Sequence, residues 1–307
     1  MLIYLQMTGN TPLPRQLLPI STNWVVPTPE NADRYDGTVA LSREIFLEGW
    51  LLPRLAEFNK RSTYVATDAW WNGHGIGPNS YHYYLNGQLG RDNATAAELL
   101  FTPVTKDKVD QSVLTGLDLD TPGHWYQYKS DSLKHSPQDD LLRRHVWLSG
   151  VTDNYMFIPE GYNKDGKCQI LLKGSTLIKF EVALDSISYN TQFPFPLEGS
   201  ILGKWSTSII LDGINGEIVI KVDEINPKIE ENIDEKLVDR DEIKTFREPL
   251  KDRMKHLTMT DLMNDMRDVL GNAWEFVLPG AGDFYIHKAM FNGEEDLLCE
   301  LKYKFQA

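Results

Sequence analysis

WEFVLPGAGDFYIHKAMFNGEEDLLCELKYKF, residues 274–305, is the most regularly patterned stretch of this chain and the one that decides its fold. Pro279-Gly280 and Asn292-Gly293 are turn signals, and apolar or aromatic residues fill the segments between them. The pattern predicts strand, turn, strand, turn, strand. The stretch holds almost no residue type that suggests catalysis, so we expect it to be structural and to close a β-sheet.

The first predicted helix spans residues 41–60, with Ser42 as its N-cap. A helix that is apolar on all sides is normally buried on all sides. Pro53 removes one backbone donor, and its ring would face the carbonyl of Gly49, so we expect either a kink or two short helices that meet there. The apolar residues that surround the axis are Ile45, Phe46, Leu47, Trp50, Leu51, Leu52, Leu55, Ala56 and Phe58.

Short aromatic and β-branched segments, separated by turn residues, predict that residues 62–185 are mostly β-strand. Within this region, 143–151 and 154–162 are predicted as separate strands, and 167–190 as two or three strands. A strong hairpin signal follows at 204–225, where two Gly-containing dipeptides mark the turn.

The segment 223–248 holds ten acidic and five basic residues, a composition typical of a solvated connector. Two amphipathic helices are predicted after it, one starting at Pro249 and one over 258–271. The apolar stripe of the first helix is Ile243, Phe246, Leu250, Met254 and Leu257. The order of elements does not alternate as in a βαβ protein, so it predicts an α+β fold with a mainly antiparallel sheet in a single domain, residues 1–307.

Composition limits the function. The chain has 307 residues and a formal net charge of -13, which disfavours nucleic-acid binding because that binding depends on basic residues. Cys168 and Cys299 lie in unrelated segments, which favours a reducing compartment. The start of the chain lacks the basic region of a signal peptide, and no apolar run is long enough to cross a membrane, so we expect a cytoplasmic protein.

Acid–base chemistry has one candidate, the sequence LDLDTPGHW with Asp118, Asp120 and His124. On a strand the two carboxylates would share one face, and paired carboxylates can raise one pKa and make a general acid. The alternative interpretation is a polar strand face before a turn. The seven histidines form no metal-binding pattern, and no nucleotide-binding loop is present, so we expect neither a metal nor a cofactor.

Aromatic residues are unusually dense in the predicted strands between residues 70 and 147. They could simply pack a sheet, or they could line a cavity for an apolar ligand, since such pockets are mostly apolar with few polar groups. The apolar helix at 41–60 would fit against that lining.

The terminal stretch resembles the closing block of the P47/OrfX family, whose members are encoded beside clostridial neurotoxin genes and have relatives in other bacteria and in fungi. The matching residues are Phe276, Leu278, Pro279, Gly280, Phe284, Phe291, Asp296, Leu297, Leu301 and Tyr303. The helix at 41–60 and the hairpin at 204–225 have their counterparts in the same order. The resemblance implies a TULIP-like fold, in which a strongly curved antiparallel sheet wraps a long helix and an apolar ligand lies between them.

Three hypotheses follow. The first is a binding protein for a lipid or other apolar small molecule, acting in an assembly of proteins. The second is a cyclase or isomerase of specialised metabolism that uses Asp118, Asp120 or His124. The third is a protein-interaction module whose partner surface is the acidic segment. The predicted ligand-binding residues are Phe46, Trp50, Leu51, Leu55, Trp70, Trp71, Tyr83, Trp125 and Trp147.

Overall fold

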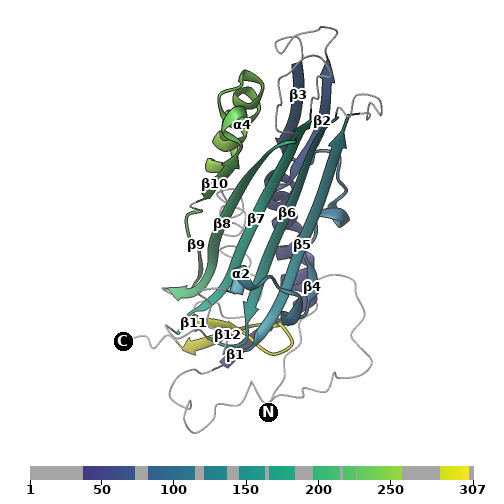
Figure 1. The fold of residues 1–307 in the computed structure, drawn as a ribbon. Helices are drawn as coiled ribbons and strands as arrows, with labels where there is room; N and C mark the ends of the chain where they lie inside the picture. Colours follow the sequence, from purple (N-terminus) through teal and green to yellow (C-terminus); the bar gives the residue numbers. More distant parts are fainter. Residues whose placement is uncertain are drawn as a thin grey trace, which may run out of the picture.

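A computed structural model describes residues 37–72, 82–114, 121–136, 145–162, 166–183, 196–214, 217–225, 227–257 and 284–303. Its largest sheet has seven strands, all paired antiparallel, in the order β10-β8-β7-β6-β5-β4, with β9 also paired to β8 (Figure 1). These strands are β4 (Thr102–Val104), β5 (Gly123–His135), β6 (His145–Pro159), β7 (Cys168–Ala183), β8 (Leu197–Ile214), β9 (Glu217–Val222) and β10 (Lys228–Ile233). The prediction of a mainly antiparallel mixed fold is therefore confirmed.

The terminal stretch supplies two strands of a smaller sheet, β11 (Phe284–Phe291) and β12 (Leu297–Tyr303). They pair antiparallel around the predicted Asn292-Gly293 turn, and β1 (Gly37–Leu41) pairs with the other edge of β12. The predicted first strand of the stretch and its turn at Pro279-Gly280 lie outside the described residues.

The predicted helix at 41–60 consists of two parts. A π-helix, η1 (Glu44–Leu51), leads directly into an α-helix, α1 (Leu52–Ser62), with Pro53 in its first turn. The π-helical turn widens the backbone just before the proline, where the missing N–H and the ring would otherwise disrupt a regular helix. The expectation of burial on all sides is wrong at Ile45, which is 58% exposed.

Two predicted groups of short strands prove to be single long ones. Residues 143–151 and 154–162 are largely the single strand β6, and most of 167–190, predicted as two or three strands, is the single strand β7. Gly150 and Gly174 lie in the middle of these strands. A β-carbon at either position would come within 2.5 Å of a large side chain, Tyr64 at Gly150 and Trp205 at Gly174.

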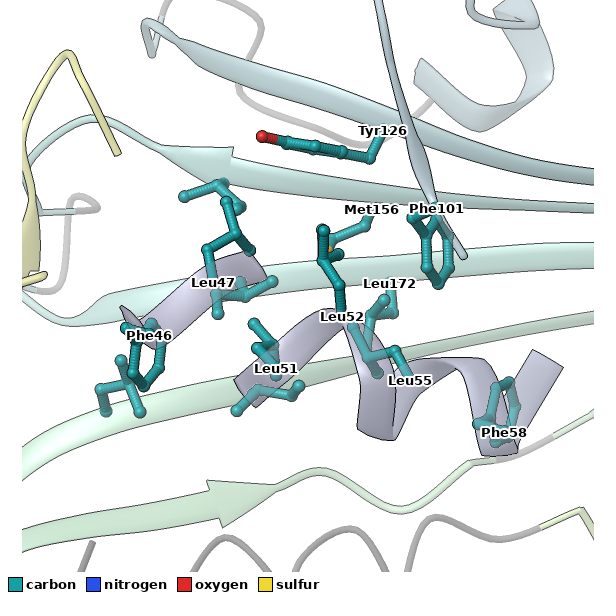
Figure 2. Packing of buried hydrophobic residues seen from close by; sticks show 14 of the residues in the cluster. Phe46, Leu47, Leu51, Leu52, Leu55, Phe58, Phe101, Tyr126, Met156 and Leu172 are labelled. Atoms are coloured by element: carbon teal, nitrogen blue, oxygen red, sulfur yellow. The ribbon is translucent and has the colours of Figure 1, made fainter. Parts of the chain in front are cut away.

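One face of the large sheet, here called the inner face, carries two apolar clusters. The first lies between η1–α1, strands β5 to β8 and the small sheet, and includes Leu47, Leu51 and Leu55 (Figure 2). The second packs a separate hairpin, β2 (Tyr64–Asn72) with β3 (His82–Leu89), against strands β6 to β8. The hairpin lies at one end of the large sheet and the small sheet at the other (Figure 1).

Buried polar residues separate the two clusters where α1 ends. The Asn154 amide donates to the Asn59 side-chain oxygen at 2.8 Å and to Ser62 Oγ at 3.1 Å, and the Asn59 amide donates to the carbonyl of Leu99. Thr63 donates its backbone N–H to the Asn59 carbonyl. Thr176 of β7 donates its hydroxyl to the Ser62 carbonyl at 3.4 Å, so the sheet satisfies a carbonyl that the end of the helix leaves unpaired.

The acidic segment 223–248, predicted as a solvated connector, forms regular secondary structure. It contains β10, a short helix α3 (Glu235–Val238) and the start of α4 (Asp241–Lys255), which lies beside the β2–β3 hairpin (Figure 1). Pro249 lies inside α4 rather than at its start. The predicted stripe is confirmed for the four members that lie in the helix, which are buried: Ile243, Phe246, Leu250 and Met254.

The opposite, outer face of the sheet is covered at one end by Val109 and α2 (Gln111–Leu114), which follow β4 and η3 (Lys106–Lys108), whereas Leu99 of η2 (Ala96–Leu99) belongs to the first cluster on the inner face. The strong curvature expected from the family resemblance is not confirmed, since none of the sheets formed by the described residues curls around the helix. The second predicted helix, 258–271, lies outside the described residues.

Candidate ligand-binding site

Three of the predicted ligand-binding residues, Phe46, Leu51 and Leu55, are buried in the first cluster. Figure 2 shows them among leucines of the same helix and side chains of the strands beneath it, including Met156 and Leu172. The density of apolar contacts explains their burial, so these side chains fill core volume.

Trp50 belongs to a different surface of the helix, which we call the helix stripe: Phe46, Trp50, Arg54 and Phe58, at four-residue spacing. The ring centroids of Phe46 and Trp50 are 5.3 Å apart, and the Arg54 guanidinium lies 4.8 Å from the centre of the Trp50 ring. Phe58 makes an edge contact with Trp205 of β8, centroid to centroid 4.8 Å. The stripe is thus a row of aromatic rings interrupted by one cation.

Three N–H groups on the helix stripe and Trp205 are buried without a hydrogen-bond partner: Trp50 Nε1, Arg54 Nε and Trp205 Nε1. Arg54 does use one other nitrogen, Nη1, which donates to the carbonyl of Trp50 at 3.3 Å. Most buried polar groups in proteins are paired, so these unpaired donors, two of them on the adjacent side chains of Trp50 and Arg54, require an explanation.

The hairpin holds three more of the predicted residues. Trp70 and Tyr84 stack across the two strands, with ring centroids 4.4 Å apart, and both are partly exposed. Trp71 is half-buried against the second cluster, whereas Tyr83 is buried and its hydroxyl has no partner. Burial first, and then the Glu242 carboxylate, raise the pKa of Tyr83.

Trp70 and Tyr83 line a cleft of about 950 Å³ between the hairpin and α4. One wall is His82–Gln88 of β3 with two residues of β2, and the other consists of residues between Asp239 and Arg253. We call this cleft the β3–α4 groove. Sequence reasoning missed it because it joins segments far apart in the chain, and because the acidic segment was interpreted as a connector.

Trp125 and Trp147 lie on the outer face. Trp125 is buried there against Phe157, with ring centroids 4.7 Å apart. Trp147 is half-buried and lines a separate cleft of about 510 Å³ beside β8 and β10. The nine predicted residues therefore do not form one lining, since an alternating strand sends its aromatic side chains to both faces.

Of the three residues that the enzyme hypothesis uses, the structure describes only His124. Asp118 and Asp120 lie outside the described residues. His124 is exposed at the start of β5, and its Nε2 lies 3.0 Å from the carbonyl oxygen of Gly293 in the β11–β12 turn. His124 lines neither of the two clefts above, so its contacts give no support to a cyclase or isomerase.

A charged cluster beside His124 was not predicted at all. Glu295 is 1% exposed, although it lies in the turn between β11 and β12. Tyr126 donates to its carboxylate at 2.7 Å, and Arg43 forms an ion pair with it at 2.9 Å. Glu295 has φ +66, a left-handed conformation that usually favours glycine or asparagine. The left-handed backbone conformation of Glu295 is unfavourable for a residue with a side chain. The contacts of its carboxylate offset this cost and fix the turn against the sheet.

The two cysteines are free and buried, and burial raises the pKa of both thiols. They are therefore protonated and poorly reactive. Within the described ranges, no three His, Cys, Asp or Glu side chains are grouped closely enough to hold a metal ion. The described helices also include none with the length and apolar character needed to span a bilayer.

The chain was compared with protein families, curated proteins and solved structures. No family model, no curated protein and no solved structure matches it significantly. The class of protein that the geometry defines is thus a mixed α/β protein with a long antiparallel sheet and two candidate binding surfaces, the helix stripe and the β3–α4 groove. Membership of the P47/OrfX family stays a prediction.

Proposed function

We propose that the protein binds an apolar or amphiphilic small molecule, such as a lipid, along the helix stripe and Trp205. The observation that supports the proposal is the set of three buried, unpaired N–H groups on Trp50, Arg54 and Trp205. Leaving a buried donor unpaired costs about 1–3 kcal/mol. An acceptor group of a ligand beside the adjacent side chains of Trp50 and Arg54 would recover that cost at these two positions.

The chemistry of the stripe favours an amphiphile with an acidic head group. Trp50 is the aromatic ring of the stripe that is only partly buried and can contact an apolar chain, whereas Phe46 and Phe58 are 2% and 1% exposed and belong to the core. Arg54 carries the charge that pairs with a carboxylate or phosphate, and its guanidinium has planar donors suited to those groups. Mostly apolar lining with a few placed donors is the usual composition of a small-molecule site.

This proposal includes the finer features that the family resemblance implies. They are a TULIP-like arrangement of sheet and helix, a ligand held next to the helix, and an accessory role in a protein assembly. The function is binding, and it needs no catalytic group, metal or cofactor.

Isothermal titration calorimetry with oleate below its micellar concentration tests the proposal. We expect saturable binding to the wild-type chain and about tenfold weaker binding to Arg54→Met, because a hydrogen bond to a charged group contributes about 1.5–3 kcal/mol. Methionine keeps the apolar stem of the side chain and removes the donors. Oleyl alcohol lacks the carboxylate, so the Arg54→Met substitution should weaken its binding much less than it weakens the binding of oleate.

Arg91→Met is the matched control. Arg91 pairs with Glu98 at 3.0 Å in an exposed position away from the stripe, so its replacement should leave oleate binding unchanged. The proposal is wrong if oleate gives no saturable heat with the wild-type chain, or if the two arginine variants weaken binding equally.

A further inference from the structure

The β3–α4 groove runs along the edge of a strand rather than over a face. Seven consecutive residues of β3, His82–Gln88, line it. Successive side chains of a strand point to opposite faces, so a cleft that touches all seven must follow the strand edge. Among the described residues, β3 pairs only with β2, and its other edge carries no strand.

The helix wall of the groove matches this edge in length. A seven-residue strand is about 23 Å long, and the 15-residue helix α4 is about 22 Å long. Arg253 donates to the carbonyl of Leu89 at 3.4 Å and marks one end of the groove. Pro249, also in the wall, has no N–H to donate, so the carbonyl of Thr245 lacks the partner that residue 249 of a regular helix supplies.

The charged residues that line the groove indicate that its ligand is positively charged. Four carboxylates line the groove against two arginines: Asp68, Asp239, Asp241 and Glu242 against Arg240 and Arg253. His82 lies 3.6 Å from the Glu242 carboxylate. The whole chain has a net charge of -13, which adds to the attraction of a basic partner.

Two aromatic features point to direct contacts with such a ligand. The stacked Trp70 and Tyr84 are 37% and 47% exposed at the groove, where they can hold the side chain of an arginine or lysine. Tyr83 is only 5% exposed, lines the groove and has an unpaired hydroxyl. This buried hydroxyl is an independent sign that a hydrogen-bonding ligand completes the site.

We propose that the β3–α4 groove binds an extended, basic segment of a partner protein, which adds as a strand to the free edge of β3. Backbone hydrogen bonds to β3 would provide affinity, and alternate side chains would reach the acidic wall and the aromatic pair. The groove and the helix stripe have no residue in common, so this surface is separate from the proposed small-molecule site.

Fluorescence anisotropy with short labelled peptides tests the proposal on the full chain. The probe is a peptide of alternating arginine and valine. Its two controls are a peptide of alternating glutamate and valine, and the basic peptide with N-methyl groups on alternate backbone nitrogens. We expect the basic peptide to bind saturably, and the acidic and N-methylated peptides to bind at least about tenfold more weakly.

Variants assign the binding to the groove. Trp70→Leu should weaken the basic peptide about fivefold through loss of the cation–π contact. Glu242→Gln should weaken it about threefold, and the effect should shrink at high salt. Glu248→Gln is the matched control, because Glu248 is exposed on the same helix and does not line the groove. Hydrogen–deuterium exchange of 82–88 should slow when the basic peptide is bound.

Three results would overturn the proposal. One is no saturable binding of the basic peptide at millimolar concentration. Another is equal affinity for the basic and the N-methylated peptides, because charge attraction alone, without backbone hydrogen bonds to β3, would then explain the binding. The last is a homodimer seen by light scattering that Trp70→Leu dissociates, which would assign the groove to a second copy of this chain.

Discussion

Glu295 fixes the β11–β12 turn against the large sheet. Its side chain is buried against Tyr126, 169 residues away in the sequence, and against Arg43. Nothing near Glu295 in the sequence predicts these partners. The one available signal was negative: a glutamate occupies a position where a turn usually has glycine or asparagine.

Glu295 also provides a prediction at this scale. Glu295→Gln should lower the free energy of unfolding by about 1–3 kcal/mol, because the ion pair with Arg43 is lost at a buried position. Glu295→Gly should also destabilise the protein, although glycine would relieve the left-handed backbone. Urea denaturation measures both. A glycine variant more stable than the wild type would show that the side chain does not hold the turn.

Secondary-structure elements were predicted better than the boundaries between them. The hairpin at 204–225, the β11–β12 pair and the stripe of α4 follow directly from turn residues and periodicity. The long strands β6 and β7 are predicted from the sequence as shorter segments. Gly150 and Gly174 within them leave space for Tyr64 and Trp205, and those contacts come from elements that the local pattern cannot identify.

The contact at Gly150 leads to a prediction for the hairpin. An added β-carbon would lie 2.0 Å from Tyr64, which belongs to β2 of the hairpin and is fully buried against β6. Gly150→Ala should therefore destabilise the protein by about 1–3 kcal/mol through overpacking. Ser149→Ala, one residue earlier on the outer face, is the control and should change stability little. Equal stability of the two variants in thermal denaturation would contradict this packing.

At the scale of the whole molecule, the large sheet supports the two proposed binding surfaces at different places. The helix stripe contacts Trp205 in the first cluster, and the β3–α4 groove borders the second cluster. The polar residues around Asn59 and Asn154 lie between the clusters. The sequence predicts Trp50, Trp70 and Tyr83 as members of one set of ligand residues, but the arrangement that separates them depends on long-range packing and could not be predicted.

Native mass spectrometry of the chain, purified gently without detergent, tests the central claim of small-molecule binding most directly. We predict an added mass in the range of a lipid, which is released on collisional activation and is less abundant in Arg54→Met than in Arg91→Met. A wild-type chain that is empty, and that stays empty after incubation with fatty acids and phospholipids, would contradict the claim.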